Sequence, residues 1–159
     1  MMLKYATGNL IDMAERGDFH VIVHGCNCFN TMGSGIAKEV RERYPEAYEA
    51  DTNFGAAGDY NKLGNYSVKL GKRFTIINAY TQYNFNRKGE TKDVFEYKSF
   101  EMILQKLAYE YPTCDFGFPY IGMGLAGGDK TRIIAMLEEF AKMLYNIGGG
   151  TVTLVEFSK

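Results

Sequence analysis

Two periods of apolar residues alternate along the chain, and they predict strands that alternate with helices. Short or alternating apolar runs predict strands over residues 3–7, 20–24, 65–70, 73–79, 114–120 and 151–157. Apolar residues that recur at helical spacing predict helices over residues 11–16, 36–44, 46–53, 95–111 and 131–146. Residues 80–92 are polar and aromatic without a clear period, which indicates a long loop.

This order of elements predicts the fold class. Strands that alternate with helices are typical of a three-layer α/β/α sandwich. Gly71 and Lys72 form a turn between the strands at residues 65–70 and 73–79, so we expect a hairpin there and a mixed central sheet. At 159 residues, without an internal repeat, a linker or a low-complexity tract, the chain is expected to form a single domain over residues 1–159.

Two glycine-rich loops, each between a predicted strand and a predicted helix, are the most informative feature of the sequence. The first reads HGCNCFNTMGSGIA from His24 to Ala37, and the second reads FPYIGMGLAGGD from Phe118 to Asp129. A glycine turn that leads into a helix exposes backbone N–H groups and the positive end of the helix dipole, which suits phosphate. Both loops follow the carboxyl ends of strands, where α/β sheets bind their ligands. We therefore expect them to hold a pyrophosphate between them.

The second loop also matches G-x-G-x-x-G, the pattern of nicotinamide dinucleotide sites, at Gly122, Gly124 and Gly127. That pattern normally opens the first βαβ unit and is followed about 20 residues later by an acidic residue. Here only one predicted helix and one strand follow, and Glu156 comes later than that spacing. The context argues against an oxidoreductase.

Composition and charge exclude several other classes. The net charge is −1, the pI is about 6.1 and no block of Lys or Arg stands out, so we expect no nucleic-acid surface. The three cysteines and two histidines lack the spacing of a zinc-binding set. Without a signal peptide or a long apolar span, we expect a cytoplasmic protein with free thiols, no membrane contact and no metal or other cofactor.

Three motifs together resemble the macro domain family. They are Gly8-Asn9-Leu10, the segments 23–28 (VHGCNC) and 32–37 (MGSGIA) of the first loop, and residues 121–129 (IGMGLAGGD) of the second loop. Their order and spacing are similar to those of the branch related to ADP-ribose-1''-phosphate phosphatases of bacteria and phages. The resemblance runs over essentially the whole chain. It implies a mixed-sheet sandwich that binds ADP-ribose or its 1''-phosphate in a cleft. No predicted helix demands a partner, so we expect a monomer.

The resemblance also implies which residues contact the ligand. Asn9 and Leu10 would lie near adenine, and Asn27 would bind hydroxyl groups of the distal ribose. Amides of the first loop would surround the distal ribose and the diphosphate, at Gly33, Ser34, Gly35 and Ile36. The second loop would close the opposite side, at Gly122, Met123, Gly124, Leu125 and Ala126. Relatives more often carry Asp, Cys and Trp where this chain has Asn9, Met123 and Lys130.

The candidates for catalysis are His24, Asn27 and Asp129. Asp129 could orient or deprotonate a water, or it could cap the helix that follows. His24 could act as an acid near neutral pH, or it could be a core histidine with a hydrogen-bond partner. Asn30 is a candidate for substrate binding. Both Asn27 and Asn30 could instead be turn residues that tolerate left-handed conformations.

Other residues near the loops have alternative roles as well. Cys28 could be a nucleophile only if the helix terminus lowered the pKa of its thiol. Tyr80, Tyr83 and Phe85, at the start of the long loop, could cover the ribose or the adenine, or they could pack onto the sheet.

The resemblance implies an enzyme that hydrolyses ADP-ribose-1''-phosphate to ADP-ribose and phosphate. One alternative is an ADP-ribosyl hydrolase that removes ADP-ribose from modified macromolecules. Related macro domains of that kind use a lysine in the middle segment, where this chain has Lys69, Lys72 and Lys88. The other alternative is a module that binds ADP-ribose without catalysis.

Overall fold

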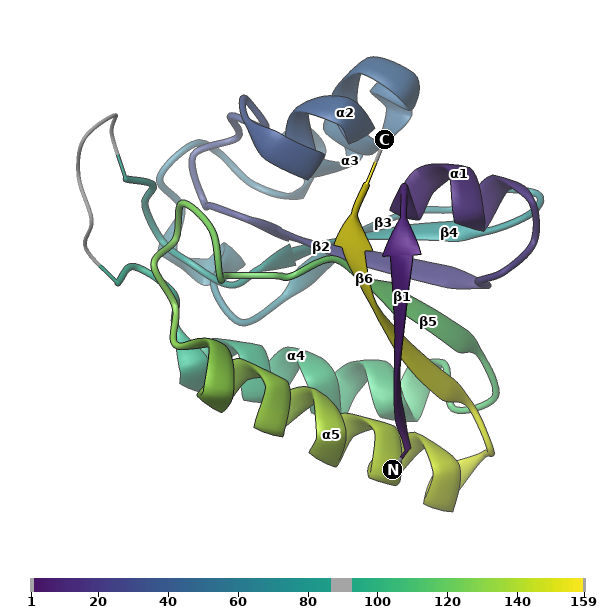
Figure 1. Cartoon of the computed structure of the whole chain (residues 1–159). Helices are drawn as coiled ribbons and strands as arrows, with labels where there is room; N and C mark the ends of the chain where they lie inside the picture. Colours follow the sequence, from purple (N-terminus) through teal and green to yellow (C-terminus); the bar gives the residue numbers. More distant parts are fainter. Residues whose placement is uncertain (1, 87–92, 159) are drawn as a thin grey trace.

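The computed structural model describes residues 2–86 and 93–158. One sheet with the strand order β1-β6-β5-β2-β4-β3 forms its centre (Figure 1). The strands are β1 (Leu3–Gly8), β2 (Val21–Cys26), β3 (Tyr66–Lys69), β4 (Thr75–Tyr80), β5 (Asp115–Phe118) and β6 (Thr151–Phe157). The edge strand β3 pairs antiparallel with β4, and the other described pairs are parallel, so the sheet is mixed.

Helices cover both faces of this sheet (Figure 1). One face carries α1 (Leu10–Glu15), α2 (Gly35–Arg43) and α3 (Pro45–Phe54), and the other carries α4 (Tyr97–Glu110) and α5 (Lys130–Ile147). A short 3-10 helix, η1 (Tyr60–Lys62), connects α3 to β3. The predicted three-layer α/β/α sandwich with a mixed sheet is therefore confirmed.

The predicted elements differ from the observed ones mainly at their ends, where local pattern is weakest. The strand predicted over residues 73–79, for example, is β4 at Thr75–Tyr80. Of the long loop predicted over residues 80–92, the part at 81–86 is irregular as expected. Residues 87–92, which include Lys88, lie outside the described residues.

The middle strand β2 is buried on both faces, which explains its unbroken apolar run. Val21 and Val23 pack into the core under α4 and α5, whereas Ile22 and Cys26 pack into the core under α1 to α3. Successive side chains of a strand point to opposite faces, so a strand covered on both sides needs apolar residues at almost every position.

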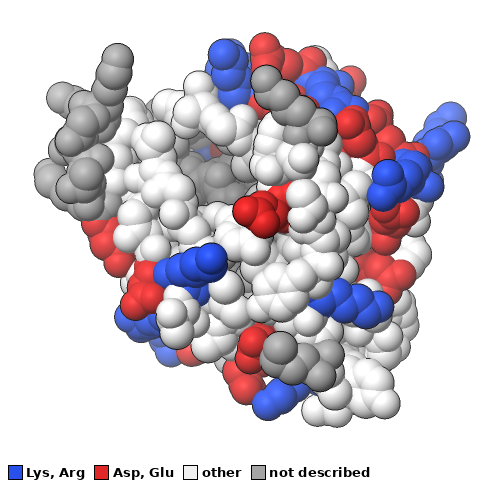
Figure 2. Space-filling view, in the orientation of Figure 1, with Lys and Arg blue, Asp and Glu red and all other residues white. Residues whose placement is uncertain are grey.

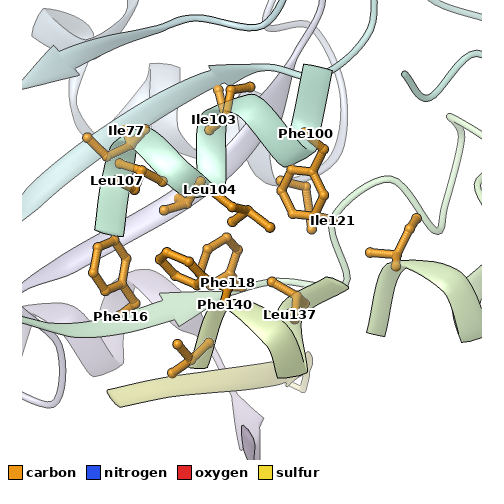
Figure 3. Packing of buried hydrophobic residues seen from close by; sticks show 14 of the residues in the cluster. Ile77, Phe100, Ile103, Leu104, Leu107, Phe116, Phe118, Ile121, Leu137 and Phe140 are labelled. Atoms are coloured by element: carbon orange, nitrogen blue, oxygen red, sulfur yellow. The ribbon is translucent and has the colours of Figure 1, made fainter. Parts of the chain in front are cut away.

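The larger core lies between the sheet and the helix pair α4 and α5. Helix α4 directs Phe100, Ile103, Leu104 and Leu107 toward the sheet, at the helical spacing seen in the sequence. Figure 3 shows these side chains facing Phe116 and Phe118 of β5 and Phe140 of α5. The rings of Phe116 and Phe140 meet edge to face at 5.2 Å between centroids, a favoured aromatic geometry.

Strands β2 and β5 are neighbours in the sheet, and this pairing determines where the two glycine-rich loops lie. They run parallel, with Val21 opposite Phe116 and Ile22 opposite Gly117. Parallel neighbours end at the same edge of a sheet, so the loop that follows β2 and the loop that follows β5 start side by side. The pairing thus brings together two segments that are far apart in the sequence.

Within residues 2–86 and 93–158, each helix is too short or too polar to span a lipid bilayer.

Gly122 fixes the course of the second loop over the core, and we expect Gly122→Ala to destabilise the protein by about 1–3 kcal/mol. Its φ of +75° is left-handed, and a methyl group at this position would overlap the ring of Phe95. Gly124 in the same loop is a matched control, because a Cβ there would meet nothing within 4 Å. Urea unfolding of both variants tests this, and equal losses of stability would contradict it.

Candidate ligand-binding cleft

The two glycine-rich loops line a cleft of about 540 Å³ at the carboxyl ends of β2 and β5. The first loop contributes Asn27 and the residues Thr31, Met32, Gly33, Ser34, Gly35, Ile36 and Ala37. The second loop contributes Gly122, Gly124, Leu125 and Ala126. Ser34 of the first loop and Leu125 of the second therefore border the same cleft, which a ligand held between the two loops requires. A hollow of this size is typical of small-molecule sites.

Backbone amides without a protein acceptor are a common feature of both loops. In the part of the chain that the structure describes, such amides include those of Gly33, Ser34, Gly35, Ile36, Gly124, Leu125 and Ala126. Ser34 is the N-cap of α2, but its side chain makes no capping hydrogen bond, and the first turn of α2 carries no acidic residue. The positive end of the α2 dipole is thus open to an anion in the cleft.

A second hollow of about 490 Å³ adjoins the first and shares Gly35, Ile36 and Pro119 with it. Asn9 and Leu10, the residues expected near adenine, line this second hollow. Asn9 is the N-cap of α1, where its Oδ1 accepts from the amide of Asp12 at 3.0 Å, while its Nδ2 donates to Glu39 Oε2 at 3.0 Å. One lone pair of Asn9 Oδ1 is therefore left for a ligand.

Asn27 is the one expected catalytic residue that lines the cleft. Its side chain also holds the first loop together, because Oδ1 accepts from the amide of Phe29 at 2.8 Å and Nδ2 donates to Thr31 Oγ1 at 2.7 Å. The roles of Asn27 as a turn residue and as a residue of the site are thus compatible, because the same side-chain amide shapes the loop and borders the cleft.

His24, the second residue expected to be catalytic, does not line the cleft. The alternation of β2 turns its side chain under α3, where its exposed fraction is 1%. There its Nε2 lies 2.6 Å from Asn78 Oδ1. Burial lowers the pKa of His24, while the hydrogen bond with Asn78 and the negative charge of Asp51 oppose that shift. His24 is a core histidine.

Three other expected residues also lie away from the lining of the cleft. Asp129 is exposed and caps α5, where its Oδ1 accepts from the amide of Arg132 at 3.3 Å. Met123 packs against the core under α4 and α5. Asn30 has a left-handed φ of 58°, donates to Gly55 O at 3.1 Å and accepts from Lys62 Nζ. The catalytic role expected of Asp129 and the ligand contacts expected of Met123 and Asn30 therefore stay predictions, at positions that do not line the cleft.

The structure adds cleft residues that sequence reasoning missed. In the first hollow these include Asp51 of α3, Gln82 and Asn86, and in the second they include Glu39 and Phe157. None of them belongs to a glycine-rich loop, which was the signal that located the site. Of the three aromatic residues for which both alternatives were open, Phe85 borders the first hollow, whereas Tyr80 is buried in the core under α1 to α3.

Neither a reactive thiol nor a lysine of the described chain is available in the cleft. Burial raises the pKa of the Cys28 thiol to about 11, so Cys28 is not a nucleophile near neutral pH. Lys69 and Lys72 border a different hollow with Glu15 and Tyr44.

Charged residues of both signs are interspersed on the face shown in Figure 2, without an extended basic patch on that face. Among residues 2–86 and 93–158, no group of three or more His, Cys, Asp or Glu side chains is arranged to hold a metal ion. The polar character of the cleft therefore comes from backbone amides and a few uncharged or acidic side chains.

We expect His24 to make the free energy of unfolding fall as the pH is lowered from about 7 to 5. The unfolded chain takes up a proton at His24 near the ordinary pKa of 6.5, whereas the folded protein takes it up only at lower pH, because burial lowers the pKa of His24. Acid therefore favours the unfolded state. Urea unfolding should show a smaller pH dependence for His24→Gln than for the wild type. His20→Gln, at an exposed histidine, is the control, and equal slopes for all three proteins would contradict this origin.

Comparisons with known proteins give whole-length relatives, although no family model matches the chain. An uncharacterized 17.5 kDa protein of phage T4, from the tk-vs intergenic region, is 32% identical over 91% of this chain and 93% of that protein. An ADP-ribose 1''-phosphate phosphatase of Candida albicans is 23% identical over 92% of this chain and 98% of that protein. A DNA ADP-ribosyl glycohydrolase of Mycobacterium tuberculosis is 32% identical over 47% of this chain, which is 18% of that protein.

Solved structures share the fold. The macrodomain of Thermus aquaticus DarG matches with a TM-score of 0.71 at 19% identity, over 99% of each chain. Thermosipho africanus DarTG in complex with ADP-ribose matches with a TM-score of 0.68 at 14% identity, over 95% of this chain and 41% of that chain. With its whole-length relatives, its two glycine-rich loops on neighbouring strands and this shared fold, the chain belongs to the macro domain family.

Proposed function

We propose that the protein binds ADP-ribose along the two adjoining hollows. The observation that carries this proposal is that two sets of unpaired backbone amides, from Gly33–Ile36 and from Gly124–Ala126, border one cleft. Amides at a helix start bind phosphate without formal positive charge. The diphosphate then lies between the loops, the adenosine extends into the hollow near Asn9, and the distal ribose extends into the hollow near Asn27.

The second hollow suits an adenine base. Leu10, Val155 and Phe157 give it apolar walls, and Phe157 is 64% exposed, which leaves an aromatic face for stacking. Asn9 and Glu39 add oxygen acceptors for the exocyclic amine of adenine. The amide oxygen of Asn9 carries no charge, so it forms a weaker bond to this amine than an aspartate would.

We further propose that the protein hydrolyses ADP-ribose-1''-phosphate to ADP-ribose and phosphate. The whole-length similarity to a phosphatase of that name supports this activity. Phosphoryl transfer depends chiefly on positioning and on stabilisation of the charge on the transferring group, which backbone amides supply. Water attacks the phosphorus and the bond from phosphorus to the 1''-oxygen breaks, which gives phosphate and ADP-ribose; we assign no step to His24 or Asp129, neither of which lines the cleft. Asn27 holds the first loop in shape and binds the distal ribose beside the phosphate.

An ADP-ribosyl hydrolase that uses a lysine is the weaker alternative. Lys69 and Lys72 border another hollow, Lys88 lies outside the described residues, and the match to the DNA ADP-ribosyl glycohydrolase spans less than half of this chain. A module that binds without catalysis is the remaining alternative, since the amide-lined cleft holds the ligand whether or not a reaction follows.

Phosphate release from ADP-ribose-1''-phosphate tests the proposed activity. We expect turnover by the wild type, and we expect Asn27→Ala to lower kcat/KM by about tenfold or more, the effect of one lost hydrogen bond in the substrate complex. Asp129→Ala should keep kcat/KM while it lowers the free energy of unfolding by about 1 kcal/mol, because it removes a helix cap.

The possible outcomes separate the three functions. Loss of phosphate release in Asp129→Ala, with the fold intact, would restore Asp129 as a catalytic residue and contradict its role as a cap alone. Binding of ADP-ribose in calorimetry without phosphate release would favour the binding module. Release of ADP-ribose from a modified protein or DNA, without phosphate release, would favour the ADP-ribosyl hydrolase.

A further inference from the structure

Asp51 of α3 lies at the inner end of the cleft, where it is a lining residue together with Cys26 although its exposed fraction is 0%. We propose that Asp51 Oδ2 accepts a hydrogen bond from a hydroxyl group of the distal ribose. Asp51 is then the residue that distinguishes ADP-ribose from ADP, which ends at the diphosphate. This inference rests on the proposed function, because it assigns a contact within the same cleft.

The two oxygens of the Asp51 carboxylate have different surroundings. Oδ1 accepts from the Tyr80 hydroxyl at 2.7 Å and from Lys62 Nζ at 3.0 Å. Oδ2 is buried and has no hydrogen-bond partner; among the described residues, Thr81 Oγ1 is the other buried side-chain atom in that state. An unpaired buried acceptor is costly, and a carboxylate oxygen accepts up to two hydrogen bonds. The described part of the folded chain therefore supplies no hydrogen-bond donor to Asp51 Oδ2.

Lys62 cannot be that donor, because its ammonium protons are already engaged. Its side chain is 1% exposed, and Nζ donates to Asp51 Oδ1, to Asp51 O at 3.1 Å and to Asn30 Oδ1. Three acceptors match the three protons of an ammonium group. Lys62 thus neutralises the carboxylate and holds it in place through Oδ1, and has no proton left for Oδ2.

The second unpaired atom lies beside another residue that lines the cleft. A Cβ at Gly25, which lines the cleft, would come within 2.9 Å of Thr81 Oγ1. The part of the chain that the structure describes thus leaves two buried side-chain oxygens unpaired, one on a cleft residue and one directly behind a cleft residue. Because both oxygens lie at residues of the cleft or directly beside one, we expect a ligand in the cleft to supply a hydrogen-bond partner.

The chemistry of ADP-ribose selects the group that meets Asp51. A carboxylate repels the phosphates, whereas it accepts a strong hydrogen bond from a neutral hydroxyl. The adenine amine is also a donor, but adenine belongs in the second hollow beside Asn9 and Glu39. The hydroxyls of the adenosine ribose go with the adenine toward the second hollow, so the hydroxyls of the distal ribose remain. Amides on the walls attract the diphosphate, and the carboxylate at the inner end attracts the sugar, so together they orient the ligand.

Calorimetry with ADP-ribose and ADP as separate ligands tests this assignment on the full chain. The measured quantity is the ratio of the Kd for ADP to the Kd for ADP-ribose. We expect the double variant Asp51→Asn/Lys62→Met to lower this ratio by about tenfold or more, because it removes a charged acceptor that only ADP-ribose reaches. Lys62 is changed as well, since a buried ammonium without its partner would destabilise the fold.

Ser67→Ala is the matched control. Ser67 is 5% exposed and its hydroxyl bonds to Tyr80 and Asn78, so the variant perturbs the same polar network without touching Asp51. It should leave the ratio unchanged. An unchanged ratio in the folded double variant would overturn the inference and leave Asp51 as half of a structural ion pair. Failure of the wild type to bind either ligand would instead overturn the proposed function.

A second measurement uses the wild type alone, in case the double variant does not fold. The ¹³C resonance of the Asp51 carboxyl carbon, assigned through couplings to its own backbone, should shift when ADP-ribose is added and should not shift with ADP. A shift of equal size with both ligands, or with neither while both bind, would overturn the inference.

Discussion

The parallel pairing of β2 with β5 is the constraint on which the cleft depends. Because these strands are neighbours and run in the same direction, their carboxyl ends meet at one edge, and each end continues into a glycine-rich loop. The pairing of β1 with β6 extends the same edge and brings Asn9 close to Phe157 in the second hollow. A strand order that separated β2 from β5 would leave two anion-binding turns with no common ligand.

The sequence predicted this arrangement well where backbone conformation decides the outcome. Glycine turns, strand patterning and helix starts are local properties, so the fold class and the meeting of the loops followed from them. Side-chain direction was harder to predict. His24 is the first residue of the first glycine-rich loop, yet the alternation along β2 turns it into the core under α3. Asp129 is the last residue of the second loop, yet it caps a helix.

The missed residues show a different limit of sequence reasoning. Asp51 stands in a polar stretch of α3 that has the pattern of a solvent-facing helix, and the sequence around Lys62 shows no periodic pattern or local motif. Their burial results from tertiary packing: α3 and η1 bring the two charges together, and Lys62 also donates to Asn30 of the first loop. An ion pair between residues that both look exposed has no signature in a single sequence.

The buried polar network gives the first loop a rigidity that glycine alone would not provide. Asn30, in its left-handed conformation, is held by Lys62 and by Gly55 O, and Lys62 is in turn held by Asp51 and Asp51 by Tyr80 of β4. Glycines lower the cost of bringing amides close to a ligand, but they raise the entropy that a mobile loop loses on binding. Anchoring the loop to the sheet through buried hydrogen bonds reduces that loss before the ligand arrives. A site whose polar groups are chiefly backbone amides depends on such support, because its binding groups are only as well placed as the chain that carries them.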